Sequence, residues 1–248
     1  DTHVELGLRA IAAGKHVLVE KPVALSSAAI EPLARAADAA GKVCAPALCM
    51  RYWPGWPWLR DRVREGTFGA VRSAAFARIS ATPRWTPFYA DTSRSGGALF
   101  DLHIHDADFV RWCFGEVRTV RAEGDMLAVR TAYTFAENTP DVTAEGAWID
   151  ASDQPFRMTY HVVFDDATAT FDAGREPAVI LTRNGREQAV ELPRESAYDA
   201  EVHDFLEAIA VGKRTMRTSI ADALAVTRVL EAELESARTK RALPVRSS

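Results

Sequence analysis

The chain of 248 residues lacks the features that define several protein classes. No apolar run approaches the ~18 residues that a membrane-spanning helix needs, so we expect no membrane partner. Three cysteines are too few for a disulfide framework, and scattered thiols are typical of a reducing compartment, which predicts a cytoplasmic protein. With 30 Lys and Arg against 34 Asp and Glu, the formal net charge is −4, which disfavours nucleic acid as a partner.

The common nucleotide-binding and nucleophile motifs are also missing. None of the 14 glycines belongs to a G-x-G-x-x-G turn, and there is no P-loop lysine motif, G-x-S-x-G or C-x-x-C. A nucleotide site built from this sequence would therefore lack its phosphate-binding turn.

Secondary-structure signals change along the chain. Residues 16–20 and 43–48 are short apolar strands of the type found in parallel sheets, and helix signals precede and separate them. Further on, a period of two over residues 156–164 predicts a half-exposed strand, and Asn184-Gly185 predicts a hairpin. Two amphipathic helices close the chain. The sequence thus predicts a parallel α/β part followed by a mainly antiparallel sheet with helices.

Lys21 is the first candidate for chemistry, because Glu20-Lys21-Pro22 follows a predicted parallel strand. Doubly wound sheets bind ligands beyond the carboxyl ends of their strands, where a partly desolvated lysine would lie near a reacting oxygen. A surface lysine in a strand-to-helix loop has the same local pattern.

The second candidate is the predicted helix from about residue 98 to 114. There Asp101, His105 and Asp108 share one face, and a carboxylate one turn from a histidine can orient the ring and raise its pKa for general acid–base catalysis. One alternative is a helix whose polar face merely satisfies the histidine. The other is a strand on which His103 and His105 bind a metal with a nearby aspartate. The Gly-Gly start and helical spacing favour a helix, on which the two histidines diverge by about 200°.

Aromatic residues form a third group of candidates. Trp53, Trp56 and Trp58 could stack on a sugar or a nicotinamide ring, or could pack the junction between two domains. Trp85 and Tyr89, in an irregular segment, could form a lip of a substrate site.

Two motifs about 80 residues apart carry a family resemblance: AGKHVLVEKP at residues 13–22, and Gly96-Gly97 followed by Asp101-x-x-x-His105-x-x-Asp108. With them, essentially the whole chain resembles the glucose–fructose oxidoreductase, inositol dehydrogenase and rhizopine-catabolism (Gfo/Idh/MocA) family. The resemblance implies a Rossmann domain, which is a doubly wound parallel sheet, and then an α/β domain with an open, mainly antiparallel sheet. Residues 1–52 would be the C-terminal portion of the NAD(P)-binding Rossmann domain, and 53–248 the substrate-binding and oligomerisation domain. The part with the glycine-rich turn is expected upstream of residue 1.

The resemblance implies a nicotinamide-dependent oxidoreductase. It would transfer a hydride between NAD or NADP and a hydroxyl or carbonyl of a sugar, inositol or related polyol, and would form a homo-oligomer through the open sheet face. An alternative is a non-catalytic fragment or relative that acts through binding or oligomer contacts.

The same resemblance assigns roles to residues. Lys21 matches the active-site lysine, His105 the general acid/base and Asp101 its supporting carboxylate, and all three are expected to contact substrate. Positions expected to line the cofactor are Thr2, His3, Glu20, Lys21, Pro22 and Arg51. The Lys21–Pro22 peptide is often cis in relatives. Because His103 stands where many relatives have glycine, the pocket or the local helix geometry is expected to differ.

Overall fold

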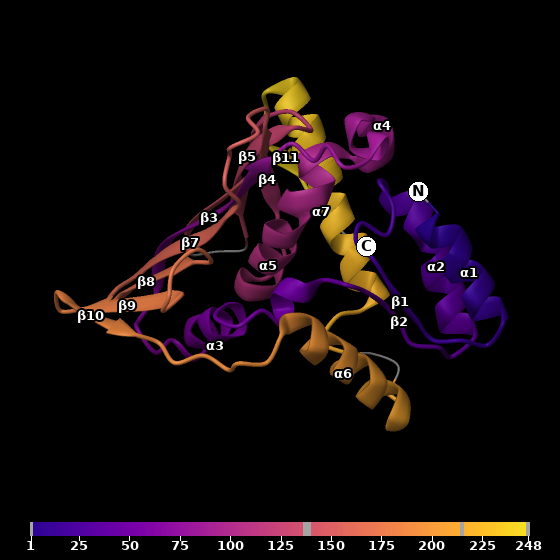
Figure 1. The fold of residues 1–248 in the computed structure, drawn as a ribbon, viewed down its shortest axis with the longest axis horizontal. Coiled ribbons are helices and arrows are strands. Elements are labelled where there is room, and N and C mark those ends of the chain that lie inside the picture. The colour runs from indigo at the N-terminus through magenta and orange to yellow at the C-terminus, as the bar shows by residue number, and fades with distance from the viewer. Residues whose placement is uncertain (1, 136–139, 214–215, 247–248) are drawn as a thin grey trace.

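A computed structural model describes residues 2–135, 140–213 and 216–246 (Figure 1). Its helices are α1 (His3–Ala12), α2 (Ser27–Ala39), α3 (Trp56–Glu65), α4 (Thr92–Ser95), α5 (Ile104–Phe114), α6 (Ala197–Ala210) and α7 (Ile220–Thr239). Its strands are β1 (Val17–Val19), β2 (Cys44–Pro46), β3 (Val71–Ala81), β4 (Thr119–Gly124), β5 (Ala128–Thr134), β6 (Asp141–Ile149), β7 (Arg157–Phe164), β8 (Thr168–Asp172), β9 (Val179–Arg183), β10 (Arg186–Ala189) and β11 (Leu243–Pro244). None of the described helices is long and apolar enough to cross a membrane.

The N-terminal part is a Rossmann-like α/β unit. Strands β1 and β2 pair in parallel, with Val17 opposite Cys44, because α2 returns the chain to the same end of the sheet. A capping bond from the Ala29 amide to the Ser26 hydroxyl starts α2. Apolar side chains of α1, α2 and β1 form one buried cluster, which includes Ile30 and Leu33.

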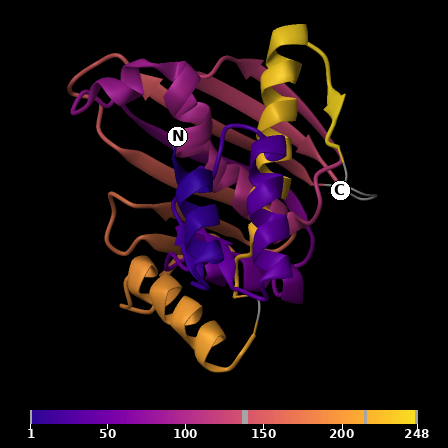
Figure 2. The same cartoon turned by 90° about the vertical axis from the view of Figure 1, so that its right-hand side faces the viewer.

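The second part is a nine-stranded sheet in the order β10-β9-β8-β7-β3-β6-β5-β4-β11. Among the described strands of this sheet, only β3 and β6 pair in parallel, so the predicted mainly antiparallel sheet is confirmed. Helices lie against one face of this sheet, and no described segment covers the other (Figures 1 and 2). Along β7, Met158, Tyr160 and Val162 point into the core, which is the predicted alternation.

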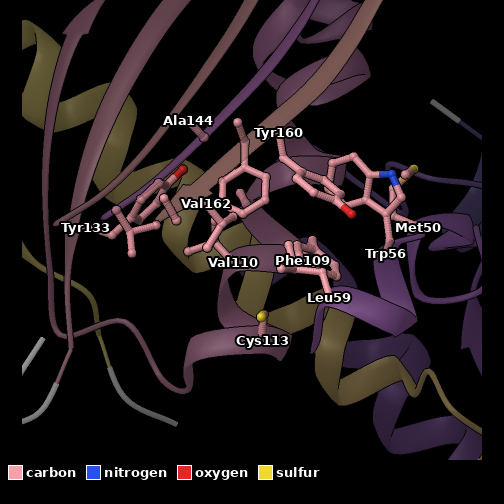
Figure 3. Close-up of a cluster of buried hydrophobic side chains, with 14 of the residues drawn as sticks. Met50, Trp56, Leu59, Phe109, Val110, Cys113, Tyr133, Ala144, Tyr160 and Val162 are labelled. Atoms are coloured by element: carbon pink, nitrogen blue, oxygen red, sulfur yellow. The ribbon is translucent and has the colours of Figure 1, made fainter. Parts of the chain in front are cut away.

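The larger core lies between the sheet and helices α3 and α5 (Figure 3). Trp56 is fully buried at its centre, with its ring 4.7 Å from that of Phe109 and 5.5 Å from that of Tyr160. One long helix links the two parts, because Ala223 at the start of α7 packs in the N-terminal cluster while Leu230 packs in the larger core.

The predicted helix over residues 98–114 is present, with one local departure. Its first turn, Leu99–His103, is π-helical, and the Ile104 amide donates to the Leu99 carbonyl five residues back. The predicted hairpin is also present, with positive φ at Asn184 and Gly185 between β9 and β10.

Candidate active site

Lys21 and Asp101 meet where the two parts of the chain join. Lys21 follows the carboxyl end of β1, and Asp101 lies in the π-helical turn before α5. The Lys21 ammonium donates to the Asp101 carboxylate at 2.8 Å and to the Asp101 backbone carbonyl at 2.7 Å. Both side chains are mostly buried, so this charge-assisted pair holds the ammonium in one place.

The pair lies at the wall of a pocket of about 660 Å³. His3, Glu20 and Pro22 line the same pocket on the side of β1 and α1, and Tyr89 lines it from the irregular segment after β3. These residues are separated by up to about 100 positions along the chain, so only the fold brings them together. Further lining residues that the sequence did not suggest are Val4, Val23, Ala24, Leu25, Ala29, Phe88, Ser93, Arg94 and Ser95.

Three of the predicted site residues, His3, Thr2 and Trp85, differ in how they stand relative to the pocket. The ring Nδ1 of His3 lies 2.8 Å from the Pro22 carbonyl oxygen, which ties α1 to the cis Lys21–Pro22 peptide. Thr2 is exposed and is not among the residues that line the pocket. Trp85 is 77% exposed and rests on Tyr89, so Tyr89 is the member of that pair that faces the pocket.

His105 lies one turn beyond Asp101, half-buried, and is not itself a lining residue of this pocket. Its Nδ1 is buried without a hydrogen-bond partner among the described residues. Burial, then the charges of Lys21 and Arg78, hold the pKa of His105 well below its ordinary value. The expected rise in pKa is therefore wrong, because the carboxylate of Asp101 bonds Lys21 rather than the imidazole.

Asp108 and Arg51 form a separate buried cluster. Arg51 donates to both oxygens of Asp108, at 2.6 and 2.9 Å, and to Asp222 at 2.9 Å. Burial disfavours the charge of Arg51, but Asp108 and Asp222 more than offset it, so the Arg51 pKa stays above its ordinary value. Arg51 is 2% exposed and does not line the pocket, so the structure does not bring it to the cofactor-lining residues. Asp108 likewise does not line the pocket, because Arg51 holds both of its carboxylate oxygens.

The tryptophans are mainly packing residues. Trp56 is fully buried, and Trp58 packs near Phe68 at a ring distance of 6.5 Å. Trp53 lies edge-on to Tyr198 at 6.1 Å, beside a second, more open hollow near β9 and β10.

His103 does not reach the pocket. It is fully buried against the sheet, with Nε2 at 3.1 Å from both the Tyr133 hydroxyl and the Glu233 carboxylate. The helix directs the His105 side chain away from that of His103. No cluster of three His, Cys, Asp or Glu residues among the described residues could hold a metal. The His103 side chain therefore packs under the helix and does not fill the pocket.

A second buried pair beside His103 was missed in the sequence. Arg78 on β3 donates to both oxygens of Asp106 at 3.1 Å, and both side chains are at most 4% exposed. Arg78 shares the inward face with Ala74 and Phe76 in an otherwise apolar strand. A charge at that period-two position was the signal that could have revealed it.

Comparison with known proteins agrees with this architecture. Residues 1–48 match a family model described as "Oxidoreductase family, NAD-binding Rossmann fold", and residues 56–175 match one described as "GFO/IDH/MocA C-terminal domain". The chain belongs to the Gfo/Idh/MocA oxidoreductase family.

Curated relatives match parts of the chain. An uncharacterized oxidoreductase of Rhizobium meliloti is 35% identical over 50% of this chain and 37% of its own length. A trans-1,2-dihydrobenzene-1,2-diol dehydrogenase of Macaca fuscata fuscata is 33% identical over 42% of this chain and 31% of its own length. An inositol 2-dehydrogenase of Acidothermus cellulolyticus is 26% identical over 98% of this chain and 72% of its own length. The first two alignments span only about a third of those relatives.

Solved structures share the fold over nearly the full chain. A levoglucosan dehydrogenase in complex with NADH superimposes with a TM-score of 0.85 at 22% identity, over 100% of this chain and 78% of its own. An aldose-aldose oxidoreductase from Caulobacter crescentus has a TM-score of 0.86 at 21% identity, over 98% of this chain and 76% of its own.

Proposed function

We propose that this chain supplies the catalytic residues of a nicotinamide-dependent oxidoreductase acting on a hydroxyl or carbonyl of a sugar, inositol or related polyol. The observation that carries the proposal is the ammonium of Lys21, held at 2.8 Å by Asp101 at the wall of a pocket. It is supported by the family membership and by relatives that are dehydrogenases of inositol and of a dihydrodiol.

The pocket suits the nicotinamide-ribose end of NAD or NADP. It lies beyond the carboxyl end of β1, where doubly wound sheets bind cofactors, and it combines a fixed cation with apolar walls from Val23 and Leu25. Glu20, Pro22 and His3 are proposed to line the cofactor, as the resemblance implies. A bound nicotinamide would supply the hydride acceptor or donor. The glycine-rich turn for the pyrophosphate is absent from the sequence.

Each site residue then has a chemical task. The low pKa of His105 keeps its imidazole neutral near pH 7, so it can accept the hydroxyl proton during oxidation. The Lys21 ammonium stabilises negative charge that develops on the substrate oxygen. Asp101 positions Lys21, which replaces the expected task of stabilising the imidazolium. Tyr89 and Trp85 are proposed to contact substrate at the pocket rim.

The first test is titration of this chain with NADH and NADPH, followed by energy transfer from tryptophan to nicotinamide. We expect saturable binding that Lys21→Met weakens by at least about tenfold, because removal of a fixed charge costs more than 1.4 kcal/mol. Lys15→Met, at an exposed position, is the matched control and should bind as wild type. Wild-type protein that binds neither nucleotide would leave the alternative of a non-catalytic chain.

The proton-transfer role has its own test in any form of the protein that turns over substrate. His105→Ala should lower turnover by ~10²–10⁴-fold. The exposed His203→Ala is the control. Unchanged turnover in His105→Ala would remove His105 from this role.

We also propose that the open sheet face joins copies of this chain into a homo-oligomer. Small or hydroxylic side chains lie near its centre, at Ala75, Ala77, Thr143 and Thr159, and charged side chains such as Arg130 and Glu145 lie beside them, so two such faces can approach closely and pair charges. Light scattering after size exclusion should report a mass that is a multiple of the 27.2 kDa chain. Ala75→Arg should shift it to the monomer.

The control for the light-scattering experiment is Ala12→Arg, at an exposed position of α1. A monomeric wild type at micromolar concentration would refute the proposal.

A further inference from the structure

A sealed polar cluster lies directly under the helix that carries the candidate catalytic residues. His103, Tyr133 and Glu233 meet from three elements, the π-helical turn, β5 and α7, and none is more than 3% exposed. Nε2 of His103 lies 3.1 Å from both of its partners. The neighbouring pair of Arg78 and Asp106 reaches the same helix from β3.

This cluster is costly to bury. Nδ1 of His103 and both carboxylate oxygens of Glu233 are buried without hydrogen-bond partners among the described residues, although Oε2 of Glu233 lies 3.1 Å from Nε2 of His103. Incompletely paired buried charges cost free energy, and apolar side chains of similar volume would cost less. Stability alone therefore does not account for these side chains.

The cluster fixes the helix on both sides of His105. His103 precedes His105 by two residues and is tied to β5 and α7, while Asp106 follows it and is tied to β3. Residues two apart on a helix point about 200° apart, so a side chain held against the sheet at 103 directs position 105 away from it.

Close backbone packing completes the arrangement. A Cβ on Gly146 of β6 would lie 2.6 Å from the Cβ of His103, so the glycine lets the π-helical turn rest directly on the strand. The turn that contains Asp101 and ends at His103 therefore has little freedom to rotate.

We propose that His103, with Tyr133 and Glu233, is a positioning residue that fixes the rotation of the π-helical turn and thereby aims His105 and the Lys21–Asp101 pair at one substrate. The inference rests on the proposed function only in taking His105 as the proton-transfer group.

The protonation state of the cluster agrees with this role. Burial lowers the pKa of His103, but the carboxylates of Glu233 and Asp106 outweigh both burial and the opposing charge of Arg78, and the net pKa is raised. The raised pKa favours the charged form of the ring, and a charge-assisted contact to the Glu233 carboxylate is a stronger anchor than a neutral hydrogen bond.

The test follows each histidine ring by NMR as the pH of the cofactor-free protein is varied within its folded range. In His103→Gln and in Tyr133→Phe, we expect the titration midpoint of His105 to rise by about half a pH unit or more, because a loosened turn lets water reach the ring. Amide exchange over residues 99–106 should accelerate by about tenfold relative to α2. The same glutamine substitution at exposed His203 should change neither quantity.

A purely structural role predicts a different result. In that case both variants lower the free energy of unfolding while the His105 midpoint and the exchange over residues 99–106 stay as in wild type, and this outcome would overturn the proposal. Tyr133→Phe removes only a hydroxyl, so the test survives if His103→Gln does not fold. Because no cofactor is needed, failure of NADH binding would count against the proposed function and not against this inference.

Discussion

Removal of the Arg51 side-chain charge separates two roles for this residue. The family resemblance places Arg51 beside the cofactor, whereas the structure buries it between α5 and α7. Arg51→Met keeps much of the length and volume of the side chain but removes every donor. Asp108, whose side chain is 1% exposed, is then left without its bidentate partner.

The size of the effect follows from these contacts. Breaking a buried ion pair by removing one partner costs about 3–5 kcal/mol, because the remaining charge is uncompensated. Asp108→Ala should cost less, about 2–3 kcal/mol, because Arg51 keeps Asp222 at 2.9 Å and the Arg217 carbonyl at 3.0 Å. In Arg51→Met/Asp108→Ala, the loss should be smaller than the sum of the two single losses by roughly 1–3 kcal/mol.

Urea unfolding followed by tryptophan fluorescence measures these differences. Arg9→Met is a surface control, because Arg9 and Glu5 are exposed and 4.0 Å apart and should contribute nothing measurable. The reasoning is refuted if Arg51→Met lowers the free energy of unfolding by less than about 1 kcal/mol. If that variant also weakens NADH binding about tenfold, the cofactor role implied by the resemblance is the correct one.

Three further predictions concern packing, pH and reactivity. Gly146→Ala should lower the free energy of unfolding by about 1–3 kcal/mol, because its methyl group meets His103, whereas Gly174→Ala at an exposed turn should not. The folded-state pKa of His105 lies below its unfolded value, so its contribution to stability is fully present above about pH 6.5. As the pH falls below that value, the free energy of unfolding should decrease by up to about 1.4 kcal/mol per pH unit. Urea unfolding from pH 7 downward should show this slope, and His105→Gln should flatten it. All three cysteines are buried with raised thiol pKa values, so a disulfide reagent should label them slowly in native protein and rapidly in urea; a fast native thiol would contradict the structure.

The sequence by itself determined the local elements and the fold class. The short apolar runs at residues 16–20 and 43–48, the period of two along β7 and the Asn184-Gly185 turn each depend on neighbours in the chain, so pattern was enough to predict them. The motifs also led to Lys21, Asp101 and His105, which the fold brings to one region.

Only the tertiary structure decided the partners of the charged side chains. Spacing on an ideal helix paired Asp101 with His105, and the family resemblance placed Arg51 beside the cofactor. In the folded chain Asp101 bonds Lys21, 80 residues away, and Arg51 bonds Asp108 and Asp222. Partner choice depends on which elements meet and on the π-helical turn, and neither is encoded in local periodicity. For the same reason the pKa of His105 moved opposite to the expected direction, because burial and distant cations, rather than its helical neighbour, set it.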